Sequence, residues 1–229
     1  MRSYVRSSLR GHFGAVRVRL DSPDPRPTPT LLHATHVSWW DGYLGLAVAE
    51  GLGLDLRVMM LASELHKYAF LRYGGAFGFD PASPGDVRAV LRYSAACLGG
   101  VGPVALLVFP AGGIGPPQAR PLPYRPGAAQ VALQAAPVSV RAVAWRLEHR
   151  ADQRPEALVR VGPPRFVVPG PVSLRPLAEA MRADLTLEAD RLEADLRESR
   201  LEGYRPWLRG RASVAENWDA VRRLIGVKV

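Results

Sequence analysis

The sequence predicts an α/β fold: a single domain with a mixed sheet flanked by helices. Short segments rich in β-branched and other apolar residues alternate with segments whose apolar residues recur every three or four positions. Turns rich in glycine and proline separate these segments. The 229 residues, 48% of them hydrophobic and 22% charged, suffice to bury a substantial core. Because no shift in composition marks a boundary, we expect one domain over residues 1–229.

The first fifty residues predict two strands and a helix. Residues 15–20 alternate apolar side chains with arginines, which is typical of a half-buried strand. The proline-rich residues 21–29 predict a loop, because each proline fixes φ and lacks an N–H. A second strand is expected over 30–35. The helical pattern over 40–50 is ended by two glycines that follow it closely.

The middle of the chain continues the alternation. We expect a strand over 56–61, a helix over 63–73, and buried strands over 104–109 and 138–143. Ser83 begins a further helix, because its side chain can accept hydrogen bonds from the first turn and the proline after it fits there.

The last third predicts one long helix. Leucine, methionine and alanine recur every three or four residues over 177–196, as on the packed face of a helix. We expect residues 150–229 to form an extension of helices and strands.

The net charge of the chain excludes few classes of binding partner. The chain has 30 basic and 21 acidic residues, a net charge of +9, and a pI near 10.4. A basic surface suits nucleic acid, an anionic membrane or a phosphorylated ligand equally well. No nucleic-acid recognition motif is present, so we do not expect a nucleic-acid partner. Cys97 is the only cysteine and cannot form an internal disulfide, so nothing requires an oxidising compartment.

The sequence predicts no membrane span. The longest apolar run, residues 104–109, is far shorter than the roughly 20 residues that a spanning helix needs. The first residues include arginines but no apolar segment of the kind that a signal peptide contains. We therefore expect a cytoplasmic protein that is peripheral on the cytoplasmic face of a membrane.

The densest group of chemically useful side chains lies over residues 32–42, where a strand is expected to end and a helix to begin. His36 and Asp41 are five residues apart, and a turn between them can close to hydrogen-bonding distance. A carboxylate on one imidazole nitrogen fixes the tautomer and leaves the other nitrogen free to take a proton. The alternative is a core histidine beside a helix-capping aspartate.

Other chemistries are poorly supported. His33, His36 and Asp41 offer three metal ligands, but a strand places positions three apart on opposite faces, so we predict no metal site. No Gly-x-Ser-x-Gly motif occurs, and Cys97 lies within an apolar helical pattern. The glycines of residues 112–115 are followed by two prolines, so no helix can begin there to bind a pyrophosphate.

Several short blocks resemble those of a known family. The order and spacing of these blocks resemble the glycerolipid (lysophospholipid) acyltransferase superfamily, including the 1-acylglycerol-3-phosphate acyltransferases, over residues 14–145. The blocks are Thr-His-Val-Ser-Trp-Trp-Asp (35–41), Gly-Ala-Phe-Gly-Phe-Asp (75–80), Phe-Pro-Ala-Gly (109–112), Tyr-Arg-Pro-Gly-Ala (124–128) and Ala-Pro-Val-Ser-Val (136–140).

The resemblance implies a function and a set of site residues. Family members transfer a fatty acyl group from acyl-CoA or acyl carrier protein to a hydroxyl of a lipid, with a histidine as general base and no cofactor. By resemblance, His36 is the base and Asp41 orients it. The implied partners are acyl-CoA or acyl carrier protein, a lipid acceptor and a membrane surface. The implied substrate-binding residues are Ser38, Gly75, Phe77, Phe109, Pro110, Gly112, Arg120 and Arg125.

The departures from the family pattern concern the phosphate of the acceptor. The arginine of the second block is Pro81 here, and the glutamate of the third block is Ala111. We therefore predict an acceptor without a glycerol phosphate, such as a sugar hydroxyl on a glycolipid or a glycosylated terpenoid. The alternatives are lysophosphatidate, with Arg120 and Arg125 as a replacement clamp, and a lipid-binding protein that has lost catalysis.

Two terminal segments are further candidates for membrane or substrate contact. The tail around Trp218 and Asp219, with the long helix, is expected to cover the acceptor groove. Near the N-terminus, a short helix is expected either to lie on anionic headgroups or to fray. That helix carries the arginine row Arg2, Arg6 and Arg10 and the apolar row Val5, Leu9 and Phe13.

Overall fold

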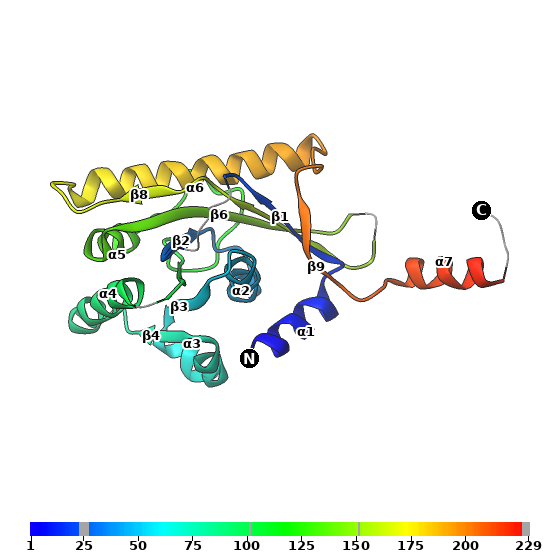
Figure 1. The fold of residues 1–229 in the computed structure, drawn as a ribbon, viewed down its shortest axis with the longest axis horizontal. Helices are drawn as coiled ribbons and strands as arrows, with labels where there is room; N and C mark the ends of the chain where they lie inside the picture. The colour runs from blue at the N-terminus through cyan, green and yellow to red at the C-terminus, as the bar shows by residue number, and fades with distance from the viewer. Residues whose placement is uncertain (23–27, 101, 151, 226–229) are drawn as a thin grey trace.

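A computed structural model describes residues 1–22, 28–100, 102–150 and 152–225. The chain forms one nine-stranded mixed sheet with helices on both faces (Figure 1), as the sequence predicts. The strands are β1 Ala15–Leu20, β2 Thr30–Ala34, β3 Asp55–Leu61, β4 Ala76–Phe79, β5 Val104–Val108, β6 Val138–Glu148, β7 Glu156–Val161, β8 Arg165–Val167 and β9 Arg205–Arg209. The helices are α1 Arg2–His12, α2 Asp41–Gly51, α3 Ala62–Lys67, the 3-10 helix η1 Ala69–Gly74, α4 Pro84–Gly99, α5 Gly127–Ala135, α6 Leu174–Arg197 and α7 Val214–Leu224.

The strand order determines where a site can form. The sheet runs β4-β3-β5-β2-β6-β7-β1-β9, and β8 pairs with β6. Strands β4, β3, β5, β2 and β6 are parallel neighbours, so their carboxyl ends lie along the same edge of the sheet. Every residue of β2 is buried, because α1 and α2 cover one face of the sheet and α4, α5 and α6 cover the other.

Two elements differ in extent from the sequence prediction. The helix expected over 63–73 is divided into α3 and η1, because Tyr68 between them has non-helical dihedrals of φ −117° and ψ 53°. The strand expected over 138–143 continues to Glu148, because its second half pairs antiparallel with β7. The helix beginning after Ser83 is confirmed, with the Ser83 side chain accepting a hydrogen bond from the Asp86 N–H at 3.2 Å.

The apolar row of α1 packs into the protein. Val5, Leu9 and Phe13 are all buried in the core cluster beneath α2. Arg2 pairs with Asp55, and Arg6 pairs with Glu50 at 2.8 Å. The expectation of a frayed segment is therefore wrong, and the apolar row cannot lie on lipid headgroups while it forms part of the core. Contact of the arginine row with headgroups stays a prediction.

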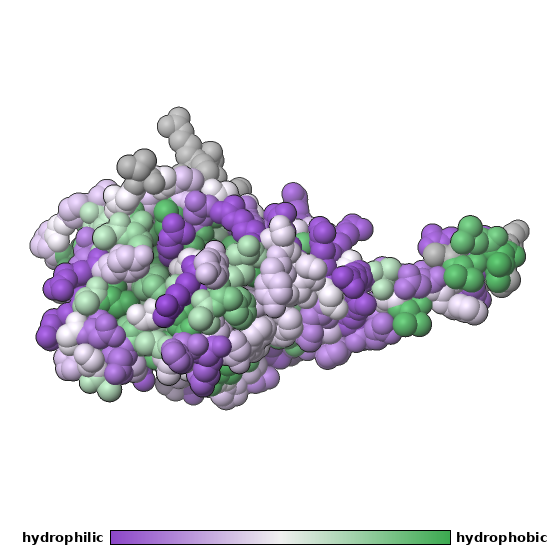
Figure 2. Space-filling view, turned by 90° about the horizontal axis from the view of Figure 1, so that it is seen from below, coloured by the Kyte–Doolittle hydropathy of each residue, from purple (hydrophilic) through white to green (hydrophobic). Residues whose placement is uncertain are grey.

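The C-terminal helix α7 extends away from the sheet and its covering helices (Figure 1). Ser213 and Glu216 form a capping box that begins the helix. Hydrophobic surface gathers on this projecting segment (Figure 2), and Trp218 is 59% exposed. The expectation that this tail covers the acceptor groove is therefore wrong for Trp218, and the Asp219 side chain lies outside the described part of the chain. No described helix is both long and apolar enough to cross a membrane.

A buried ion cluster fixes the long helix α6 to the sheet. Arg160 of β7 donates to Glu188 at 2.9 Å and to Asp195 at 2.7 Å, both on α6. It also donates to Asp21 at 2.6 Å, and the Tyr204 hydroxyl donates to Asp195 at 2.9 Å. Charges removed from water in this way stabilise a fold only while every partner is present.

Replacing Arg160 tests this dependence. In Arg160→Leu, Glu188 and Asp195 lose their buried counter-charge and keep only pairs with the more exposed Arg191, Arg19 and Arg200. We therefore expect the free energy of unfolding to fall by about 3 kcal/mol. The control Arg175→Leu removes an exposed ion pair with Glu179 and should change the free energy of unfolding by about 0.5 kcal/mol or less. Urea unfolding of both variants measures the difference, and equal small losses would contradict a stabilising role for the cluster.

Candidate active site

His36 and Asp41 are joined in the turn between β2 and α2. The Nδ1 atom of His36 lies 2.8 Å from an Asp41 carboxylate oxygen. Asp41 is fully buried and also accepts hydrogen bonds from the Val37 N–H at 2.6 Å and the Ser38 N–H at 3.0 Å. The Ser38 hydroxyl donates to its other oxygen at 2.8 Å. The Asp41 carboxylate therefore accepts four hydrogen bonds, one of them from His36.

This arrangement defines what His36 can do. With Asp41 on Nδ1, the imidazole is held with its proton on Nδ1, so Nε2 can take a proton from a bound ligand. The ring stacks on Phe109, with ring centroids 4.2 Å apart and an angle of 17° between the planes. The carbonyl of His36 also accepts a hydrogen bond from the Gly115 N–H at 2.9 Å. His36 is therefore held both by the turn between β2 and α2 and by the loop that follows β5.

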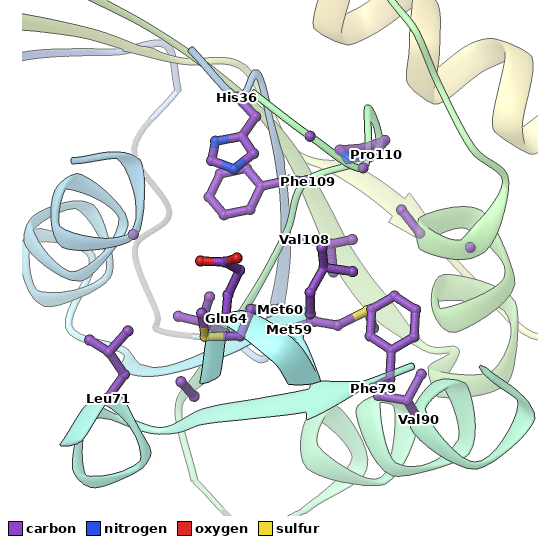
Figure 3. A pocket seen from close by; sticks show the side chains of 18 of the residues that line it. His36, Met59, Met60, Glu64, Leu71, Phe79, Val90, Val108, Phe109 and Pro110 are labelled. Carbon is purple, nitrogen blue, oxygen red and sulfur yellow. The ribbon is translucent and has the colours of Figure 1, made fainter. Parts of the chain in front are cut away.

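A large apolar cavity of about 910 Å³ begins at His36. Its size lies in the range typical of small-molecule sites, roughly 300–1,000 Å³. The cavity extends from the His36 and Phe109 rings toward β3, β4 and α4 (Figure 3). Hydrophobic side chains on its wall include Met59, Met60, Leu71, Phe79, Val90 and Val108.

The cavity lies at the carboxyl ends of three adjacent parallel strands. His36 follows β2, Phe109 follows β5, and Glu64 is in the helix that follows β3. Each of these residues lines the cavity. Topology therefore brings together three residues that lie far apart in the sequence.

Among the described residues, the charged side chains that line the cavity are those of Glu64 and Arg125. The Arg125 guanidinium lies over Gly112, where a Cβ atom would be 3.0 Å from its Cζ. Gly112 also has a φ of +78°, so the turn after Phe109 requires glycine both for its backbone and for this close approach. The backbone N–H of Arg125 donates to the Pro110 carbonyl at 2.9 Å, which fixes the two loops together.

Sequence reasoning missed Glu64. The carboxylate points into the cavity below the Phe109 and His36 rings (Figure 3), and its Oε1 atom pairs with Lys67 at 2.7 Å. The available signal was an acidic residue in the first turn of the helix that follows a parallel strand, at the edge of the sheet where sites form.

Four of the predicted binding residues lie on the cavity wall: Phe109, Pro110, Gly112 and Arg125. Arg120 does not. Its guanidinium donates to Asp190 of α6 at 2.7 Å and to the carbonyls of Pro117 and Ala119 at 3.1 and 2.8 Å. The expectation that Arg120 reaches the site is wrong, because α6 holds it elsewhere.

The other predicted binding residues have supporting positions. Ser38 binds Asp41 and also accepts from the Trp40 N–H at 3.1 Å. Gly75 has a φ of +88° in the turn before β4, where a Cβ would lie 2.3 Å from the Leu56 carbonyl oxygen. Phe77 packs on Tyr93 with ring centroids 4.8 Å apart. None of the three lines the cavity, so their role as binding residues stays a prediction.

His33 faces away from this site. It is buried in β2, and its Nδ1 lies 3.3 Å from the Tyr124 hydroxyl. Burial lowers the pKa of His33 from 6.5 to about 4, with Arg165 adding to the effect and Asp184 opposing it. His33 is therefore neutral at pH 7. No group of three histidine, cysteine or acidic residues that could hold a metal occurs in the described ranges.

The fold and the site together define an α/β protein in which a partly buried histidine pairs with a buried aspartate at the head of an apolar cavity. Among solved structures, the chain is similar to the crystal structure of the 1-acyl-sn-glycerophosphate (LPA) acyltransferase, PlsC, from Thermotoga maritima. The TM-score is 0.54 at 16% sequence identity, and the match covers 78% of this chain and 73% of that chain. The chain thus has the fold of this acyltransferase structure, as its sequence blocks implied. No family model matches the chain, and no curated protein matches its sequence.

The low pKa of His33 predicts a pH dependence of stability. Because the unfolded chain binds a proton at this residue near pH 6.5 and the folded chain only near pH 4, stability is complete above pH 6.5 and is lost toward pH 4. We expect His33 to account for a loss of up to about 3 kcal/mol over this range. Urea unfolding at pH 7 and pH 4.5 measures this loss. The free energy of unfolding should fall less in His33→Asn than in the wild type, and an equal fall in both proteins would contradict the role of His33.

Proposed function

We propose that the protein is an O-acyltransferase that transfers a fatty acyl group from a thioester, acyl-CoA or an acyl carrier protein, to a hydroxyl of a lipid acceptor. The observation that carries the proposal is the His36–Asp41 pair at the head of an apolar cavity. The fold supports it, since the similar PlsC structure is that of an acyltransferase. The likeness of the sequence blocks to the acyltransferase superfamily supports it as well.

In the proposed reaction, Nε2 of His36 takes the proton of the acceptor hydroxyl as its oxygen attacks the thioester carbonyl. The tetrahedral intermediate then collapses, the C–S bond breaks, and the departing thiolate takes the proton from His36. The products are an ester and a free thiol. Asp41 stabilises the imidazolium and keeps Nε2 directed toward the substrates. The thioester is already activated, so the chemistry uses no further cofactor.

The apolar cavity supports a fatty acyl substrate. Transfer of each methylene from water to such a wall contributes about 0.8 kcal/mol. The wall from β3 to α4 offers this surface continuously and starts beside the proposed base (Figure 3). Because both proposed substrates carry hydrocarbon chains, we also propose that the enzyme works as a peripheral protein on the cytoplasmic face of a membrane.

The acceptor that we propose has no glycerol phosphate and is a glycolipid or another neutral lipid with a free hydroxyl. Pro81 and Ile114 line the cavity where the superfamily blocks have arginines, and Ala111 replaces a glutamate. Arg120 is held by Asp190. Acylation of lysophosphatidate would depend on Arg125, the remaining clamp candidate on the described wall.

Loss of the base tests the proposed function. We expect His36→Ala to lower the rate of acyl transfer by about 10²–10⁴-fold, the usual contribution of a general base. The control His66→Ala alters an exposed position of α3 outside the cavity and should leave the rate within about twofold.

The assay follows label from radioactive palmitoyl-CoA and palmitoyl carrier protein into lysophosphatidate and into a neutral glycolipid extract. Label that enters the glycolipid only with intact His36 would support the whole proposal. Label that enters phosphatidate instead would contradict the proposed acceptor. Equal rates for the wild type and His36→Ala would contradict the role of His36 and favour a lipid-binding protein without catalysis.

A further inference from the structure

Glu64 is a carboxylate on the wall of an otherwise mostly apolar cavity. It lies in the first turn of α3, which directly follows β3, and Figure 3 shows it pointing toward the Phe109 and His36 rings. Its Oε1 atom pairs with Lys67 at 2.7 Å, and its side chain is 41% exposed. The carboxylate therefore meets both the cavity and water, at the end of the cavity that holds the proposed base.

The position of this carboxylate selects among ligands by charge. An ionised carboxylate only accepts hydrogen bonds, so it can bind the hydroxyls of a neutral polyol. A phosphate at the same place has no proton to donate when it is fully ionised and is repelled. The opposite charge in the cavity, Arg125, is on the separate wall formed by Gly112 and the start of α5.

We propose that Glu64 is a specificity-determining residue that binds the uncharged, hydroxyl-bearing headgroup of the acceptor and rejects a phosphorylated one. This inference rests on the proposed acyltransferase function. In this arrangement Arg125 is left to receive a phosphate of the acyl donor. The acceptor headgroup then lies on the α3 side of His36, and its hydroxyl reaches Nε2 from that side.

A purely structural role for Glu64 makes a different prediction. An exposed pair three residues apart on a helix contributes about 0.3–0.5 kcal/mol, and either partner is equally necessary for it. Lys67→Gln breaks the pair and keeps the carboxylate in the cavity. Glu64→Gln breaks the same pair and removes the negative charge. The two variants therefore separate helix stabilisation from selection of the acceptor.

The test uses two acceptors that differ only in the phosphate: 1-oleoylglycerol and 1-oleoylglycerol 3-phosphate, with palmitoyl-CoA as donor. We expect the wild type to have the higher kcat/KM for 1-oleoylglycerol. Glu64→Gln should shift the ratio of the two kcat/KM values toward the phosphorylated acceptor by about tenfold, mainly through KM. Lys67→Gln should keep the wild-type ratio within about twofold.

Binding without the donor gives a second measurement that does not depend on catalysis. Trp39 lines the cavity, so its fluorescence can report titration with each acceptor, with Trp39→Phe as the control for the signal. The ratio of the two Kd values should change in Glu64→Gln in the same direction as the kinetic ratio.

The outcomes separate the two proposals. If the wild type transfers acyl groups but Glu64→Gln keeps the wild-type ratios, or Lys67→Gln shifts them equally, the role of Glu64 is overturned and the acyltransferase stands. If no acyl group is transferred to either acceptor or to the glycolipid extract, the acyltransferase proposal fails. The Kd ratios then decide whether Glu64 selects neutral headgroups, and an unchanged ratio would overturn that selection as well.

Discussion

The buried carboxylate of Asp41 is the constraint on which the site depends. A carboxylate without contact to water is stable only when its oxygens are fully hydrogen-bonded. Here the donors are two backbone N–H groups, a serine hydroxyl and the His36 imidazole. Asp41 is also the first residue of α2, where the helix N-terminus favours negative charge. The same contacts that satisfy Asp41 fix the turn, and through it the tautomer and direction of His36.

The parallel sheet supplies the rest of the site. Strands β3, β5 and β2 are consecutive in the sheet although far apart in sequence, so their carboxyl ends place α3, the Phe109 loop and the His36 turn side by side. Helices cover both faces of these strands, which leaves this edge as the place where polar groups meet the cavity. Phe109 connects the His36 turn with the cavity, since it stacks on His36 and lies on the cavity wall. The site thus combines one local turn with contacts set by strand order.

The sequence could predict the local contacts of the site better than those that depend on strand order and packing. The His36–Asp41 contact is local, so spacing across one turn showed that it could form, and the resemblance of the sequence blocks selected it over a core histidine. Apolar periodicity predicted the strands β1, β2, β3, β5 and β6 and the long helix α6. Tertiary packing decided the rest. Arg120 was expected in the site by its place in the sequence, but Asp190 of α6 holds it elsewhere. Glu64 enters the cavity through the packing of α3, and its place after β3 was a signal that only the strand order makes specific. The row of Val5, Leu9 and Phe13 suits a membrane or a core equally well, and only the fold decides for the core.

The most direct test of this account is the protonation of the two ring nitrogens of His36, measured by nitrogen-15 NMR at pH 8 and assigned by comparison with His36→Ala. The account predicts that Nδ1 carries the proton and Nε2 does not, because Nδ1 donates to Asp41. In Asp41→Asn this preference should be lost. A wild-type ring with its proton on Nε2 would contradict the assignment of Nε2 as the base.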